Sequence, residues 1–151
     1  MNNMTKEQRG LASKYESVYI DANCFIYASL SEEGVSEKAR KILEQVKNGF
    51  YKKAFTSTLT VDEFIWRIQK EVGRDLASEG AGIFFNLENL ELISVDTSIM
   101  LNALDNYKKE KLDPRDAIHL ATMQSKNIKA IISSDPDFDK VKGIKRINFS
   151  K

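Results

Sequence analysis

The sequence predicts an α/β layered fold built on a mostly parallel sheet. Short runs of β-branched and aromatic residues alternate with longer stretches of helical periodicity, and no internal repeat or linker interrupts them. Two parallel strands need a crossover connection, usually a helix, so this alternation indicates parallel pairing. The run AIIS at 130–133 is continuously apolar, which is typical of a central parallel strand buried on both faces.

The first half of the chain begins with the β-branched and aromatic run SVYI. The expected elements here are a strand at 17–20, helices at 22–30 and 37–48, a strand at 54–57, and helices at 60–72 and 74–87. Ala39, Leu43 and Val46 fall on one face of the second helix, and Gly49 directly after it is a helix stop signal. Thr60 is expected to open the helix that follows the second strand.

The second half repeats the alternation. The expected elements are a strand at 90–95, a helix at 97–110, a helix from 113 to about 127, and strands at 130–133 and 145–149. The start of the second helix is well marked, because Pro114 at the first helical position follows Asp113 as a cap.

Composition bounds the class of protein. The 151 residues, 42% hydrophobic and 30% charged, suit one soluble domain, which we expect over 17–151 after a polar tail or short helix over 1–16. No apolar stretch approaches the roughly 18 residues that cross a bilayer, and the start has no secretory signal, so we expect a cytoplasmic protein with no membrane partner. One cysteine and one histidine argue against a disulfide or a multi-cysteine zinc site. A net charge of +1 gives no global field for non-specific nucleic-acid binding.

Four acidic residues fall where the expected strands end and the helices begin. Asp21 and Asp135 follow strands, whereas Glu63 and Asp116 lie in the expected first turns of helices. In open α/β sheets, ligands bind outside the carboxyl ends of the strands, so these four acids could face one cleft.

Each acid also has a purely structural interpretation. Glu63 could complete a capping box with Thr60, and Asp21 could be a simple N-cap. Asp116 could serve the helix dipole, and Asp135 before Pro136 could make an ordinary turn.

Their combination favours chemistry. Carboxylates that gather in one place repel one another, and they need a counter-cation if all are ionised. Oxygen ligands suit Mg²⁺ or Mn²⁺, which keep room for waters and a substrate phosphate. Such ions can activate water against a phosphodiester.

The four acidic segments also resemble a known family. Tyr19-Ile-Asp21-Ala-Asn23, Thr60-Val-Asp-Glu63, Arg115-Asp116-Ala-Ile-His-Leu-Ala121 and Ser133-Ser-Asp135-Pro-Asp137-Phe138-Asp139 are similar, in order and spacing, to the acidic motifs of the PIN-domain family. The resemblance covers residues 17–149.

The resemblance implies a three-layer α/β/α sandwich and a Mg²⁺-dependent ribonuclease in which Mn²⁺ can substitute. It implies that the metal-holding catalytic acids are Asp21, Glu63, Asp116 and Asp135. Asn23 and Ser133 would support them, and Asp137 or Asp139 could replace Asp135 as the fourth acid. Small members of this kind usually act as VapC-like toxins of a type II toxin–antitoxin pair. They cleave RNA as homodimers and are silenced by an antitoxin protein.

Alternatives remain open at this level. The chain could be a PIN nuclease of RNA processing, or a non-catalytic scaffold that binds RNA or protein and uses its acids as helix caps. His119 is expected to be a packed or hydrogen-bonded structural residue, and Cys24 a small core hydrophobe. Trp66 lies off the apolar stripe of its helix, and is expected either at an exposed interface or under the segment 74–87.

Overall fold

The computed structural model describes residues 15–30 and 33–151, so the expected tail at 1–16 lies almost wholly outside the described residues. The elements, in chain order, are β1 (Ser17–Ile20), α2 (Ala22–Ser29), α3 (Val35–Lys47), β2 (Lys53–Ser57), α4 (Thr58–Val72), α5 (Arg74–Gly80), α6 (Ile83–Asn86), β3 (Leu90–Ile93), α7 (Thr97–Glu110), α8 (Pro114–Ser125), β4 (Ala130–Ile132), the 3-10 helix η1 (Pro136–Lys140) and β5 (Lys145–Ile147). In the part of the chain that is described, no helix has the length and apolar character needed to span a membrane.

The five strands form one sheet in the order β3-β2-β1-β4-β5, and every neighbouring pair is parallel. The chain first moves outward from β1 to β2 and β3, and then returns through α7 and α8 to place β4 on the other side of β1. The strand order therefore reverses beside β1. In open parallel sheets, the crevice at such a reversal is where ligands bind.

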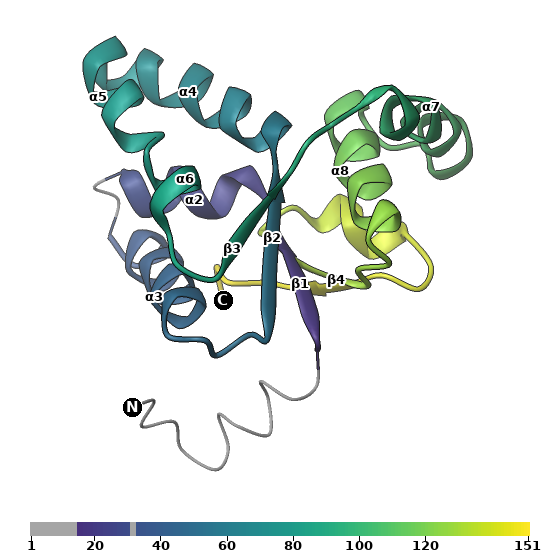
Figure 1. Cartoon of the computed structure of the whole chain (residues 1–151), viewed down its shortest axis with the longest axis horizontal. Helices are drawn as coiled ribbons and strands as arrows, with labels where there is room; N and C mark the ends of the chain where they lie inside the picture. The colour runs from purple at the N-terminus through teal and green to yellow at the C-terminus, as the bar shows by residue number, and fades with distance from the viewer. Residues whose placement is uncertain (1–14, 31–32) are drawn as a thin grey trace.

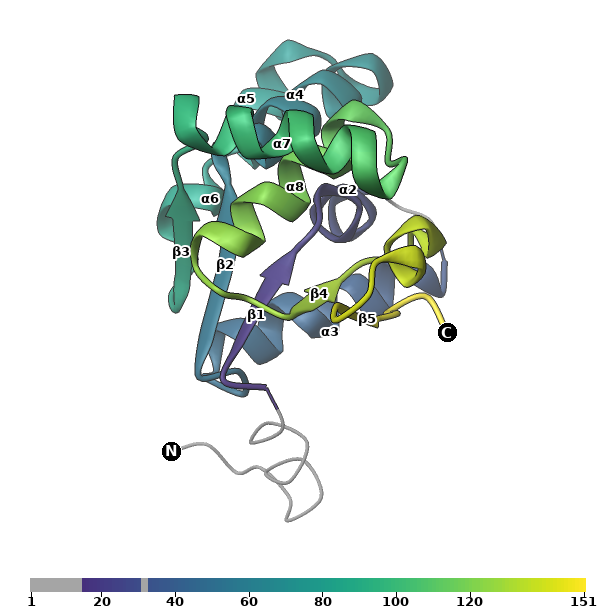
Figure 2. The ribbon, with the colours of Figure 1, turned by 90° about the vertical axis from the view of Figure 1, so that its right-hand side faces the viewer.

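Helices cover both faces of the sheet, which gives the three predicted layers. Figure 1 shows α2 and α3 on one side and α7 and α8 on the other, and Figure 2 shows α8 passing in front of β2. Side chains alternate across a strand, so Val18 and Ile20 enter the core under α2 and α3, whereas Tyr19 enters the core under α7 and α8. The α/β fold with a parallel central sheet is thus confirmed.

The expected single helix at 74–87 is wrong in one respect. The segment breaks into α5 and α6 between Gly80 and Ile83. Glycine is a poor helix former; Gly80 is the last residue of α5, and Gly82 lies in the break. Gly80 also allows a close approach: a Cβ there would lie 3.2 Å from the ring of Phe64, which is fully buried.

The start of α4 also differs from the expectation. The helix begins at Thr58, with Ser57 at the N-cap position, rather than at Thr60. Strand β2 passes directly into the helix, so Thr60 is an interior helical residue with no exposed surface. The capping box expected between Thr60 and Glu63 is therefore absent.

Candidate functional site

Two of the four acids sit at the carboxyl ends of adjacent strands. Asp21 follows β1 and caps α2, its Oδ1 accepting a hydrogen bond from the Ala22 amide at 2.7 Å. Asp135 follows β4 and caps η1, its Oδ1 accepting from the Asp137 amide at 2.9 Å. The structural interpretations of both acids, an N-cap for Asp21 and a turn contact with a backbone amide for Asp135, are thus present. Each of these contacts uses Oδ1 alone, which leaves Oδ2 of each carboxylate for contacts outside its own cap.

The other two acids come from helices that flank this edge. Asp116 lies in the first turn of α8, as expected. Glu63 lies in the second turn of α4, not the first, because the helix begins two residues earlier than the sequence suggests. The helix dipole acts mainly on the first turn, so it stabilises the Glu63 carboxylate little.

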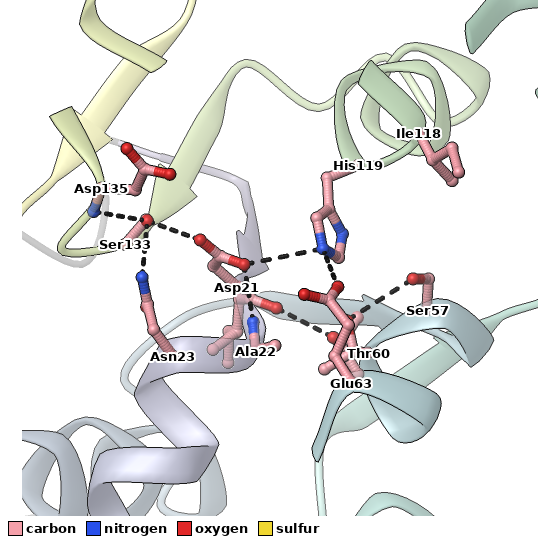
Figure 3. A network of polar contacts seen from close by, with 12 residues as sticks. Asp21, Ala22, Asn23, Ser57, Thr60, Glu63, Ile118, His119, Ser133 and Asp135 are labelled. Atoms are coloured by element: carbon pink, nitrogen blue, oxygen red, sulfur yellow. Dashed lines mark hydrogen bonds and ion pairs between the residues drawn. The ribbon is translucent and has the colours of Figure 1, made fainter. Parts of the chain in front are cut away.

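Ser133 ties the two strand-end acids together. Its hydroxyl donates to Asp21 Oδ2 at 2.6 Å and accepts from the Asp135 amide at 3.0 Å (Figure 3). It also accepts from Asn23 Nδ2 at 3.2 Å. Because the one hydroxyl proton goes to Asp21, the Asn23 amide must present its NH₂ group to Ser133. Among the described residues, this leaves the buried Asn23 Oδ1 without a hydrogen-bond partner.

His119, the single histidine of the chain, connects the acids to the sheet. It is fully buried, and its Nε2 lies 2.6 Å from Glu63 Oε1 and 3.6 Å from Asp21 Oδ1 (Figure 3). On the other side of the ring, Nδ1 lies 2.6 Å from the Tyr19 hydroxyl. The expectation of a packed, hydrogen-bonded histidine is confirmed, but its partners belong to the acidic site.

The hydrogen bonds fix where the protons lie. The Tyr19 hydroxyl donates its proton to Ser57 Oγ at 2.8 Å, so its oxygen must accept from His119 Nδ1. His119 therefore carries a proton on Nδ1. The short contact between Nε2 and Glu63 then requires one shared proton, which removes one negative charge from the acid group. Burial disfavours a charged imidazole, but Tyr19, Glu63 and Asp21 outweigh it and raise the pKa of His119 well above its usual value.

The remaining acids repel one another. Burial, followed by the nearby charges of Asp135 and Asp21, raises the pKa of Asp116 to about 7. Burial also raises the pKa of Asp21, although His119 and the Ser133 hydrogen bond oppose this effect. These mutual effects show that all four acids lie within electrostatic reach of one another at one edge of the sheet.

The loop after β4 offers three aspartates in different settings. One oxygen of Asp137 lies within 4.8 Å of carboxylate oxygens of both Asp113 and Asp116. Asp113 occupies the N-cap position of α8 but makes no capping hydrogen bond, contrary to the expectation. Asp139 is held away from the group by Arg146, whose Nε and Nη2 donate to it at 2.9 and 2.8 Å. Asp137 also pairs with a cation, because its Oδ1 accepts from Lys140 Nζ at 2.9 Å, but unlike Asp139 it lies beside Asp113 and Asp116. Asp135 and Asp137 are therefore the aspartates of this loop that remain candidates for the fourth acid.

This donor set fits a hard divalent cation. It consists of carboxylate oxygens, the ligands that Mg²⁺ and Mn²⁺ prefer. A pKa of about 7 for Asp116 means that the group is only partly ionised at neutral pH when no cation is bound. A cation would relieve that repulsion, and the free Asn23 Oδ1 adds an oxygen acceptor beside Asp21.

Sequence reasoning did not assign roles in the site to Tyr19, His119 or Asp113. The pattern around His119 gives no sign of its partners, because they lie 56 and 100 residues away along the chain. The expectation that Cys24 is a core residue is confirmed. Of the two positions left open for Trp66, the structure shows the exposed one.

Comparisons with known proteins agree with this geometry. A family model described as PIN domain matches residues 18–144. No curated protein shows a significant match to the sequence.

Several solved structures share the fold at low sequence identity. VapC20 of Mycobacterium tuberculosis, described as a Sarcin-Ricin loop cleaving toxin, aligns with a TM-score of 0.70 and 15% identity over 81% of this chain and 92% of its own. VapBC2 of Rickettsia felis, described as bound to a DNA fragment from its promoter, aligns with a TM-score of 0.65 and 14% identity over 87% of this chain and 98% of its own. A toxin–antitoxin complex from Klebsiella pneumoniae aligns with a TM-score of 0.62 and 20% identity over 87% of this chain and 97% of its own.

Proposed function

Because the chain belongs to the PIN-domain family, we propose that it is an endoribonuclease that depends on Mg²⁺ or Mn²⁺ and hydrolyses RNA phosphodiester bonds. The observation that carries the proposal is the convergence of Asp21, Glu63 and Asp116 with the loop after β4, where the pKa of Asp116 rises to about 7. Acids that repel one another in this way are a poor solution for stability alone, and a cation accounts for them.

The proposed metal-holding groups are the carboxylates of Asp21, Asp116 and Asp135, with Glu63 assisting. A bound Mg²⁺ or Mn²⁺ supplies Lewis acidity that lowers the pKa of water, orients it and stabilises the leaving oxygen. Asp137, next to Asp116 and Asp113, is the other candidate in the loop after β4.

The neighbouring residues orient these carboxylates. Ser133 fixes Asp21 by donating to Oδ2 and restrains the Asp135 backbone, so that one hydroxyl links the two acids at the ends of β1 and β4. His119, held by Tyr19, fixes Glu63 and holds the shared proton at Nε2. Outer hydrogen bonds of this kind set the orientation and basicity of metal ligands.

The same proposal extends to the biological role. We place the chain as the toxin of a VapBC-like type II toxin–antitoxin pair, with an antitoxin protein as partner, RNA as substrate, a homodimer as the active form and the cytoplasm as its compartment. Support comes from the solved structures of similar fold, which include a VapC toxin, a VapBC assembly and a toxin–antitoxin complex. Growth arrest on expression, relieved by Asp116→Asn, would support the toxin role. Arrest without relief, or no arrest, would favour a PIN nuclease of RNA processing.

The test of the enzymatic proposal is cleavage of a mixed pool of single-stranded and structured RNA by purified protein. Reactions contain Mg²⁺, Mn²⁺ or EDTA, and the matched variants are Asp21→Asn and Asp105→Asn, the latter an exposed aspartate of α7. We expect cutting with either metal, none with EDTA and loss only in Asp21→Asn. Equal cutting by Asp21→Asn and wild type would contradict the assignment.

A non-catalytic scaffold is the second candidate, and one observation favours it. Asp21 and Asp135 both accept capping hydrogen bonds, so each has a structural use without metal. The two functions differ in metal binding. A site that binds Mn²⁺ only in the folded state raises the unfolding midpoint, whereas acids that serve only as caps leave it unchanged.

A further inference from the structure

The only tryptophan of the chain lies at the rim of the acidic site. Trp66 follows Glu63 by three residues on α4, so the two side chains leave the helix on the same side, one turn apart. The residue is 44% exposed. An indole exposed at this level next to the candidate acids is available to a ligand that reaches them.

Two cations accompany the indole ring. Lys70 Nζ lies 3.4 Å from the ring centroid, and the guanidinium carbon of Arg115 lies 5.7 Å from it. Arg115 belongs to α8 and directly precedes Asp116. The cluster of Trp66, Lys70 and Arg115, here called the aromatic rim, therefore joins the helix that carries Glu63 to the helix that carries Asp116.

We propose that the aromatic rim is a subsite for one unpaired nucleobase of the RNA and its phosphate, next to the site of cleavage. This inference rests on the proposed function and adds a substrate-binding element to it. Unpaired bases stack on exposed aromatic rings, and nearby Lys and Arg side chains neutralise the backbone. The ammonium of Lys70 lies over the ring in the free protein and is exposed, so an arriving base can displace it toward a phosphate.

Charge explains why such a rim is needed. The acidic group repels the phosphates that it must approach, and the net charge of +1 for the whole chain supplies no attraction at long range. Cations placed at the edge of the acids, rather than among them, attract the backbone without occupying the carboxylates.

A protein partner is the competing occupant, and the face of the helix argues against it. The apolar groove between α4, α5 and α6 is lined by Val61, Ile65 and Phe85 among others, and Trp66 is not part of it. Val61, Ile65 and Gln69 form one helical stripe, whereas Glu63, Trp66 and Lys70 form another. The charged groups that contact the Trp66 ring are both cations, Lys70 and Arg115, and cations suit a nucleic acid better than an apolar protein surface.

Intrinsic fluorescence tests the proposal directly, because every tryptophan photon comes from Trp66. Wild-type protein in EDTA, which should prevent cleavage, is titrated with a short single-stranded RNA, with an abasic ribose-phosphate chain of the same length and with duplex RNA. We expect saturable quenching with the single strand and a much smaller change with the other two. No change, or an equal change with the abasic chain, would overturn the proposal. Emission that shifts with protein concentration alone would place a second copy on the ring and would also overturn it.

Variants supply the second readout. We expect Trp66→Ala to weaken single-stranded RNA binding in EDTA, measured by fluorescence anisotropy of a labelled RNA, by about 10-fold or more, as expected for one lost stacked base. Trp66→Phe should recover part of this loss, and Leu76→Ala, an exposed apolar change on α5, should have no effect. Mn²⁺ affinity should stay at the wild-type value in all three variants. RNA affinity unchanged in Trp66→Ala would refute the subsite. If wild-type protein binds RNA in EDTA but does not cleave it in Mn²⁺, that result would refute the proposed enzyme and leave the subsite standing.

Discussion

Replacing Asp116 by asparagine is expected to stabilise the metal-free protein. The wild-type carboxylate is partly buried and faces the charges of Asp135 and Asp21, which together raise its pKa to about 7. The ionised form is therefore less favourable in the folded protein than in the unfolded chain. Asparagine keeps the size and polarity of the side chain and removes the charge.

The magnitude follows from the difference between the folded and unfolded pKa values. A rise from 3.8 to about 7 corresponds to at most about 4 kcal/mol of destabilisation, and partial exposure of the group reduces this to about 2 kcal/mol. For a group whose pKa is raised on folding, the stabilising effect is complete below the unfolded pKa and is lost as the pH rises through the folded value. The cost of Asp116 is thus small near pH 4 and complete above pH 7.

Urea and thermal unfolding in EDTA at pH 5 and pH 8 measure this effect. At pH 8 we expect the free energy of unfolding of Asp116→Asn to exceed that of wild type by about 2 kcal/mol, which corresponds to a thermal midpoint about 4–8 °C higher. At pH 5 we expect less than half of that difference. In saturating Mn²⁺ the wild type should become the more stable protein, because only its intact site binds the ion tightly. The reasoning fails if Asp116→Asn is no more stable than wild type at pH 8, or if Asp105→Asn gives the same gain.

Four further outcomes are expected. Calorimetry should show Mn²⁺ affinity about 10-fold weaker at pH 6 than at pH 8, since a proton competes for Asp116 with a pKa of about 7; a flat profile would contradict this. Ser133→Ala should weaken Mn²⁺ binding about 10-fold or more by releasing Asp21, and an unchanged titration would show that the hydroxyl does not orient it. Tyr19→Phe should lower the free energy of unfolding by about 1–3 kcal/mol in urea, because it leaves buried polar groups unpaired, and a neutral result would remove the link to His119. Cys24, buried and with a pKa raised by burial, should react with a thiol reagent only on unfolding, whereas rapid labelling of the native protein would refute its burial.

The sequence predicts the order of strands and helices because each element carries its own local signal. The apolar run at 130–133 and the cap before Pro114 both correspond to elements near the expected positions. Once the strands are predicted, their carboxyl ends are predicted too, and these ends define the edge of the sheet at which Asp21 and Asp135 meet. Periodicity and turn chemistry act over a few residues, so they can be read without the fold.

Contacts between distant segments could not be predicted in the same way. His119 meets Tyr19 across 100 residues and Glu63 across 56, and no local pattern encodes either distance. Asp113 carries a strong cap signal, yet its side chain lies with Asp116 and Asp137 instead of capping α8. Local preferences place these residues on their elements, but packing of α8 against the sheet decides which groups they touch.

The most direct test of the proposed metal-dependent nuclease is a paired measurement of Mn²⁺ binding and RNA cleavage on the same preparations. Wild type, Asp21→Asn, Asp116→Asn and Asp105→Asn are titrated by calorimetry and then assayed on the RNA pool. We expect Asp21→Asn and Asp116→Asn to lose both properties, and Asp105→Asn to keep both. Wild-type binding and cleavage in Asp21→Asn and Asp116→Asn would show that the acidic group is not the centre of this protein's chemistry.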